Sequence, residues 1–114
     1  MTFYELKVGV GSKEEGVSLL KKLVEEKILS GGNILSSDSC FYWQDKINEV
    51  EDYIVVSIVR TADLQGLETK ISKLTSFEDP LITFTELSYI NRKAADHIMH
   101  NTNPNKSCSE AKQL

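Results

Sequence analysis

The segment from Glu49 to Thr61 constrains the fold more than any other part of the sequence. Its middle, Tyr53 to Val59, is an almost unbroken apolar run that is rich in β-branched residues. Such residues pack well on the pleated surface of a sheet, so the segment predicts a β-strand. Because the run is apolar at successive positions rather than at every second one, we expect this strand to lie in the centre of the sheet.

The residues after Gly11 predict the first helix. Ser12 is followed three positions later by Glu15, which is the spacing of a capping box at a helix N-terminus. Apolar residues then recur at helical spacing, at Val17, Leu20, Val24 and Ile28, with Leu19 and Leu23 beside them. We expect this helix to end just before Gly31 and Gly32, which suit a left-handed C-terminal cap.

A second helix should follow the central strand. Either Thr61 or Asp63 can cap it, and about one apolar residue per turn follows, at Leu64, Leu67, Ile71 and Leu74. A short, mostly polar helix is expected from Asn91 to about His100. The polar tail 101–114 is expected to be disordered.

Further strands are predicted at Phe3 to Val10, Asn33 to Trp43 and Leu81 to Leu87. The serine-rich stretch 36–39 interrupts the second of them, so we expect that strand to be bent or bulged, with a turn at 44–46. The order strand–helix–strand–strand–helix–strand is that of the ferredoxin-like α+β sandwich, in which both helices lie on one face of an antiparallel sheet. We therefore expect one such domain over residues 1–100, followed by the tail.

Composition argues against several classes of protein. The 114 residues fit one domain, and the net charge of −4 is unlike that of a nucleic-acid binder. No apolar stretch approaches the roughly 20 residues that span a bilayer, so no membrane association is expected. The N-terminus has no signal-peptide pattern, which favours the cytoplasm. Cys40 and Cys108 are most simply interpreted as free thiols, although a disulfide between them remains open.

Several short motifs occur in a characteristic order over residues 3–98. They are Ser12-Lys13-Glu14-Glu15-Gly16, Leu23-Val24-Glu25-Glu26-Lys27-Ile28, Asn33-Ile34-Leu35, Phe41-Tyr42-Trp43-Gln44-Asp45-Lys46-Ile47, Val59-Arg60-Thr61 and Phe77-Glu78-Asp79-Pro80-Leu81-Ile82. In this order, and at nearly this spacing, they resemble the CutA divalent-cation tolerance proteins. The resemblance implies a cytoplasmic homotrimer linked to tolerance of divalent cations such as copper, with an architecture like that of the PII signalling proteins.

The sequence departs from the family pattern at telling positions. The position where the family often has a Cys is Gly31 here, and the family's His-Pro-Tyr corresponds to Thr75-Ser76-Phe77. The glycine of the family's hairpin is Asp45. Because Cys and His are natural ligands of copper and zinc, the two losses weaken the prediction that this chain binds copper directly.

Four residues are candidates for lining a ligand cleft between subunits. Tyr42, Trp43 and Lys46 lie together at the end of the predicted hairpin, where an aromatic face and an ammonium could meet a ligand anion, and Glu78 precedes the last strand. Alternatively, the aromatic side chains only pack a contact between subunits, since aromatics are favoured at interfaces. Lys46 and Glu78 would then simply be solvated.

Cys40, His97 and His100 are the candidate metal ligands. The two histidines lie three positions apart on a predicted helix, near one face of it. A structural metal site needs about four protein ligands, and this pair with Asp96 offers at most three, so solvent-exposed histidines are the alternative. Cys40 could bind a soft metal if three copies met in a trimer, whereas a buried Cys40 would act as a small hydrophobic residue.

The sequence contains no recognisable catalytic arrangement. It lacks a phosphate-binding glycine loop, a Gly-x-Ser-x-Gly elbow and an obvious base beside a nucleophile. We therefore predict a non-catalytic, trimeric regulatory or binding protein with no certain cofactor; a divalent cation such as copper is the candidate cofactor. A direct copper-binding protein is the first alternative, and a ferredoxin-like enzyme with a site between subunits is the second.

A trimer is also reasonable on physical grounds. The two long strands joined by a short hairpin extend past the helices that would cover them, and bare strand edges invite pairing with another chain. A closed ring of identical subunits removes that exposure. We expect Phe41, Tyr42 and Trp43 to be buried in the assembled form.

Overall fold

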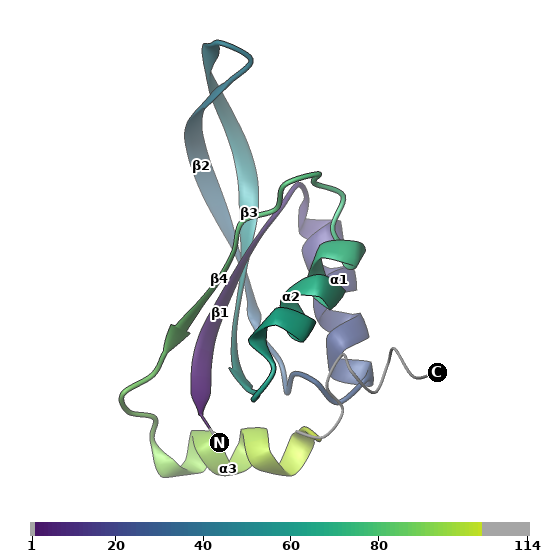
Figure 1. The fold of residues 1–114 in the computed structure, drawn as a ribbon, viewed down its shortest axis with the longest axis vertical. Helices are drawn as coiled ribbons and strands as arrows, with labels where there is room; N and C mark the ends of the chain where they lie inside the picture. Colours follow the sequence, from purple (N-terminus) through teal and green to yellow (C-terminus); the bar gives the residue numbers. More distant parts are fainter. Residues whose placement is uncertain (1, 104–114) are drawn as a thin grey trace.

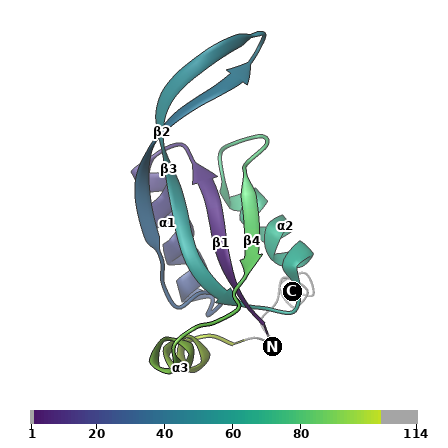
Figure 2. The same ribbon diagram turned by 90° about the vertical axis from the view of Figure 1, so that its left-hand side faces the viewer.

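The computed structural model describes residues 2–103, which form four strands and three helices (Figure 1). These elements are β1 (Phe3–Val10), α1 (Lys13–Glu25), β2 (Asn33–Trp43), β3 (Lys46–Arg60), α2 (Leu64–Leu74), β4 (Ile82–Glu86) and α3 (Arg92–Asn101). The strands form one sheet in the order β2-β3-β1-β4, and every neighbouring pair is antiparallel. Because α1 and α2 lie on the same face of this sheet (Figure 2), the predicted ferredoxin-like α+β fold is confirmed.

The hydrophobic core lies between the sheet and helices α1 and α2. From Leu6 onward, every second side chain of β1 is completely buried, and β3 and both helices contribute further buried residues. The core includes Leu6, Val8, Val10, Leu19, Leu23, Leu29, Val55, Val59, Leu67 and Ile71. Each fully buried aliphatic side chain of this kind contributes about 1.5–3 kcal/mol of transfer free energy, so the described chain carries a continuous core of its own.

Helix α1 presents a different face to the core than its apolar pattern predicts. Leu19 and Leu23 are buried, whereas Val17 and Val24 are exposed. The reason is Gly16, where an added Cβ would lie 3.3 Å from side-chain atoms of Ile34 and Val55. This glycine lets the helix approach the sheet closely, and the residues three and seven positions later then point inward as well.

Helix α1 also ends earlier than predicted, at Glu25. Lys27 adopts the left-handed conformation, with a φ of 63°. The N–H groups of Lys27 and Ile28 donate to the carbonyl oxygens of Val24 and Leu23, each at 3.0 Å, which is the Schellman arrangement. The predicted cap at the two glycines is therefore wrong. Gly32 instead lets its backbone lie close to β3, because a Cβ there would lie 2.8 Å from the carbonyl oxygen of Val56.

Of the bend or bulge expected in β2, the bulge is absent, and the turn after the strand has two residues instead of three. β2 pairs with β3 residue for residue, from Asn33 opposite Val56 to Trp43 opposite Lys46. The serine-rich stretch is part of this ladder, so the two strands are joined by only two turn residues, 44 and 45. The N-cap of α2 is Asp63, whose carboxylate accepts from the N–H of Gly66 at 2.9 Å.

Part of the β2–β3 ladder extends well beyond the rest of the sheet. β1 pairs with β3 only over Tyr53–Arg60. The remaining seven residues of β3 and the facing part of β2 therefore form a two-stranded extension, residues 37–52, which we call the arm. The arm projects past both helices in Figures 1 and 2.

Helix α3 lies at the end of the molecule opposite the arm (Figures 1 and 2). It follows the predicted range to within one residue at each end, and Ile98 is its buried contact. The predictions about residues 104–114 and about Cys108 lie outside the described residues, so they stay predictions.

Candidate functional site

The tip of the arm carries three of the four candidate cleft residues. Trp43 and Lys46 form the last ladder pair before the turn, and Tyr42 pairs with Ile47 one step below. Side chains opposite each other in a ladder share a face, while successive residues alternate. Trp43 and Lys46 therefore leave one face of the arm, and Tyr42 and Ile47 leave the other.

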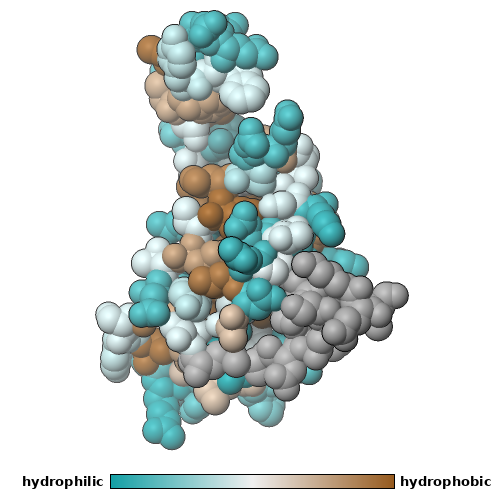
Figure 3. All heavy atoms as spheres, in the orientation of Figure 1, coloured by the Kyte–Doolittle hydropathy of each residue, from teal (hydrophilic) through white to brown (hydrophobic). Residues whose placement is uncertain are grey.

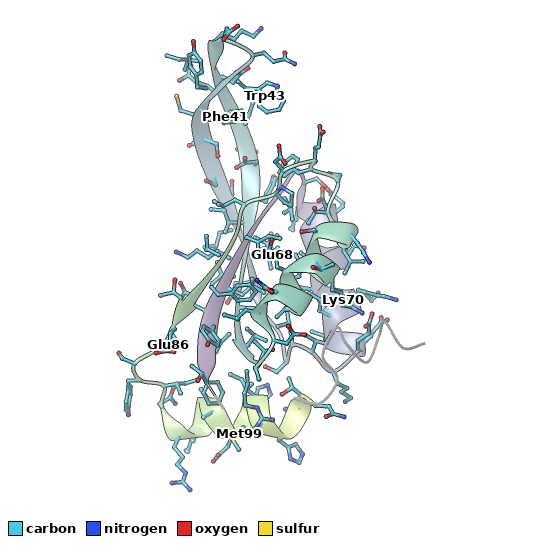
Figure 4. The ribbon with its side chains drawn as sticks, viewed as in Figure 1. Phe41, Trp43, Glu68, Lys70, Glu86 and Met99 are labelled. Atoms are coloured by element: carbon cyan, nitrogen blue, oxygen red, sulfur yellow. The ribbon has the colours of Figure 1, made fainter. Side chains whose placement is uncertain are left out.

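The aromatic side chains of the tip are exposed in the single chain. Exposed fractions are 70% for Tyr42, 52% for Trp43, 71% for Ile47 and 42% for Phe41. Figure 4 shows Phe41 and Trp43 on the arm, away from the helices. Hydrophobic surface continues on the body just below the arm (Figure 3). Large apolar side chains gathered on a projecting two-stranded ribbon are typical of a surface that another chain covers.

Glu78, the fourth candidate, lies in the loop between α2 and β4 and is exposed. This loop is on the body, and the arm tip stands clear of it in both ribbon views (Figures 1 and 2). One chain therefore does not bring Glu78 together with Tyr42, Trp43 and Lys46. A cleft that contains all four residues would have to combine at least two chains.

The loop that carries Glu78 is tied to the start of α1 by Glu15. The Glu15 carboxylate accepts from the N–H of Ser76 at 2.9 Å, from the Ser76 hydroxyl at 2.7 Å and from the N–H of Gly11 at 3.3 Å. Partial burial acts to raise the pKa of Glu15, but these donated hydrogen bonds outweigh it and leave the pKa below its ordinary value. Ser12 caps the helix as predicted, by accepting from the N–H of Glu15 at 3.0 Å. The Glu15 side chain bonds Gly11 and the distant loop.

A second charged contact joins the end of α1 to α2. Glu26 forms a hydrogen-bonded ion pair with Lys70, whose side chain is only 16% exposed, and lies 3.5 Å from Lys22. Burial acts to raise the pKa of Glu26, whereas the hydrogen bond and charge of Lys70, together with Lys22, lower it overall. This charged cluster links the end of α1 to α2. It lies away from the candidate cleft residues.

The three candidate metal ligands do not come together in one chain. Cys40 is exposed on the arm, opposite Glu49, and the prediction that it is buried is wrong for the single chain. His97 and His100 are exposed on α3, at the other end of the molecule. Within residues 2–103, no group of three or more His, Cys, Asp or Glu side chains could hold a metal ion. The described residues of one chain therefore do not fit a copper site.

A groove of about 490 Å³ lies beside α3. It is lined by Glu5, Val56, Ile58 and the His97 side of the helix, together with the segment 30–33. The Nδ1 atom of His97 is 3.2 Å from the side-chain nitrogen of Asn101. The groove contains none of the other candidate site residues.

Sequence reasoning missed the residues that hold the candidate loop and the arm tip. The sequence does not predict the contact of Ser76 with Glu15, because this hydrogen bond links positions 61 residues apart. Asn48 was also missed, although its side-chain nitrogen donates to the carbonyl oxygens of Trp43 and Lys46, both at 3.1 Å. An Asn near a hairpin without glycine was the one signal that could have pointed to it.

The sheet order, the two helices on one face and the projecting arm define a small ferredoxin-like α+β protein with an extended central hairpin. Solved structures of this class superpose well on the chain. CutA1 from Oryza sativa has a TM-score of 0.83 at 19% identity, covering 90% of this chain and 95% of that one. The periplasmic divalent cation tolerance protein CutA from Archaeoglobus fulgidus has a TM-score of 0.82 at 20% identity, with coverage of 89% and 99%. The divalent cation tolerance protein CutA1 from Thermus thermophilus has a TM-score of 0.79 at 24% identity, with the same coverage.

The sequence identifies the family. Residues 6–101 match the family described as CutA1 divalent ion tolerance protein. The chain belongs to the CutA1 divalent ion tolerance family. A comparison with curated proteins finds no match. Among the described residues, no helix is long and apolar enough to cross a membrane.

Proposed function

We propose that the protein is a cytoplasmic, non-catalytic homotrimer that serves divalent-cation tolerance as a regulatory or binding protein. The observation that carries this proposal is the uncovered arm, with Tyr42, Trp43 and Ile47 each more than half exposed. Burying these side chains against a second copy would remove apolar surface from water, which is the main driving force of association. Closing the contact into a ring leaves no copy with an uncovered arm.

The cleft in this proposal lies between neighbouring copies. Tyr42, Trp43 and Lys46 come from the arm of one copy, and Glu78 comes from the body of the next. The geometry of one chain, in which the arm tip and the Glu78 loop stand apart, supports this division. An aromatic face, an ammonium and a carboxylate together offer groups that could bind a small polar ligand.

The cytoplasmic location is supported by Cys40. Among the described residues its thiol has no disulfide partner, and it is exposed. An exposed free thiol persists in a reducing compartment and is readily oxidised elsewhere. The periplasmic location named for the Archaeoglobus fulgidus protein describes that protein.

Direct copper binding is the second candidate function, and exposed Cys40 is the observation that favours it. A thiolate is a good ligand for copper, and three copies of the arm would supply three of them. The described part of one chain supplies too few ligands, so this function also depends on assembly.

The experiment that tests both functions is native mass spectrometry with size-exclusion chromatography, with and without Cu(II). We expect a trimer that forms without metal and takes up no copper. A well-folded monomer at micromolar concentration would contradict the proposal. Stoichiometric copper that is lost in Cys40→Ser, but retained in a His97→Asn/His100→Asn double variant, would place the direct copper function first.

A further inference from the structure

The turn at the tip of the arm is strained. Gln44 and Asp45 are its two central residues, and their φ angles are 52° and 62°. Two-residue hairpin turns with positive φ at both central positions normally use Asn-Gly or a similar pair, because glycine has no Cβ to clash. Neither residue here is glycine. A left-handed residue with a Cβ costs roughly 1–2 kcal/mol, which applies in full to Gln44 and less to Asp45, because aspartate tolerates this conformation. Something else must hold this turn closed.

Asn48 supplies that restraint. Its side-chain nitrogen donates to the carbonyl oxygen of Trp43 and to that of Lys46, both at 3.1 Å. These two residues flank the turn on either side, so one amide group bridges both of its ends. Asn48 is also half-buried, although most of the residues around it at the tip are exposed. Its side chain is therefore packed down onto the turn.

We propose that Asn48 is the positioning residue of the interface cleft: it fixes the directions in which Trp43 and Lys46 leave the arm. The inference rests on the proposed function, since these two residues are the arm's contribution to the cleft. They share the last ladder pair, so their relative orientation is set by the turn that joins them. If the turn opens, the indole and the ammonium separate, while the body of the protein keeps its core.

The chemistry of the side chain explains why asparagine fits this position. A primary amide is short enough to reach its own turn and carries two N–H donors, one for each carbonyl oxygen. Aspartate has nearly the same shape but no donor when ionised, and it would place negative charge beside two carbonyl oxygens. The Asn48→Asp variant therefore removes the clamp with almost no change in volume.

The test measures backbone amide hydrogen exchange at residues 43–47 of the full-length protein, together with Trp43 fluorescence. Trp43 is the only tryptophan in the chain, so its emission reports on the arm tip alone. In Asn48→Asp we expect about tenfold faster exchange at the tip, a change in Trp43 emission and an unchanged exchange rate in the core strand β1. Asn33→Asp is the matched control, because it makes the same charge change at the exposed body end of β2.

A second substitution makes the test specific. Asp45→Gly relieves the left-handed strain without touching Asn48, since glycine adopts this φ at little cost. In the Asn48→Asp/Asp45→Gly double variant we expect slow exchange at the tip and wild-type emission to return. The oligomeric state of the single and the double variant is then measured by size-exclusion chromatography. We expect Asn48→Asp to weaken subunit association about tenfold and the double variant to restore it.

The outcomes separate this inference from the proposed trimer. Wild-type exchange and emission in Asn48→Asp overturn the inference, as does a double variant that shows no recovery. Neither result bears on the proposed trimer, which depends on the size of the wild-type protein in solution. A wild-type monomer overturns the proposed trimer, and the exchange comparison on that monomer still decides whether Asn48 fixes the tip.

Discussion

Replacing Glu15 by Gln should measurably destabilise the protein at neutral pH. The carboxylate accepts three hydrogen bonds, from Gly11 N–H at 3.3 Å and from the N–H and hydroxyl of Ser76 at 2.9 and 2.7 Å. A hydrogen bond to a charged group contributes about 1.5–3 kcal/mol when buried, and less at a site that water reaches. Gln keeps one acceptor oxygen but loses the charge, so we expect a loss of about 1–2 kcal/mol in the free energy of unfolding.

The effect should depend on pH in a defined direction. The pKa of Glu15 lies below its ordinary value of 4.5 in the folded protein, because the hydrogen bonds from Ser76 and Gly11 outweigh the effect of burial. A lowered carboxyl pKa stabilises the folded state fully above the unfolded pKa. That stabilisation is lost as the pH falls through the folded pKa. The difference between wild type and Glu15→Gln should therefore be largest near pH 7 and shrink below about pH 4.

Urea unfolding followed by far-UV circular dichroism at pH 7 and pH 3 measures this difference. The matched control is Glu14→Gln, which removes the same charge from the same helix turn at an exposed position. Interaction with the helix dipole is common to both variants, so only the bonds to Ser76 and Gly11 separate them. Equal destabilisation by both substitutions would refute the reasoning, as would a loss in Glu15→Gln that is as large at pH 3 as at pH 7.

Three further substitutions test other parts of the structure. Lys27→Gly should raise the free energy of unfolding by about 1 kcal/mol in urea, because glycine adopts the φ of 63° at that helix end without strain; a loss would contradict the left-handed assignment. Lys70→Met should lower the free energy of unfolding by about 1–2 kcal/mol and raise the pKa of Glu26 in NMR titration, because the cation nearest to Glu26 is removed. An unchanged pKa of Glu26 would count against this prediction. Trp43→Ala should leave monomer folding intact and weaken the trimer in sizing, since the indole is half exposed; an undiminished trimer would show that the arm tip is not the contact.

The order of elements could be read from the sequence because it depends on local patterns. The β-branched run at Tyr53–Val59 marks the central strand, and the polar cap at Ser12 marks the start of α1. The face of α1 could not be read in this way. Val17 and Val24 are as apolar as Leu19 and Leu23, and only the close contact of Gly16 with the sheet decides which pair is buried.

The candidate site was only partly accessible to the sequence. Tyr42, Trp43 and Lys46 were recognised because they are neighbours in a short motif, and the ladder confirms that they share the arm tip. Their separation from Glu78 could not be foreseen, because it depends on how far the arm extends past β1. The placement of Cys40 and the histidines at opposite ends of the molecule follows from the same topology.

The sequence by itself determined the type and order of the strands and helices, since propensity, periodicity and capping act over a few neighbouring residues. Only the tertiary structure decided which groups far apart in the chain meet. The carboxylate of Glu15 accepts hydrogen bonds from Ser76, Glu26 forms an ion pair with Lys70, and no helix of the described chain covers the arm. Long-range contacts of this kind are selected by packing of the whole chain, so no short stretch of residues encodes them.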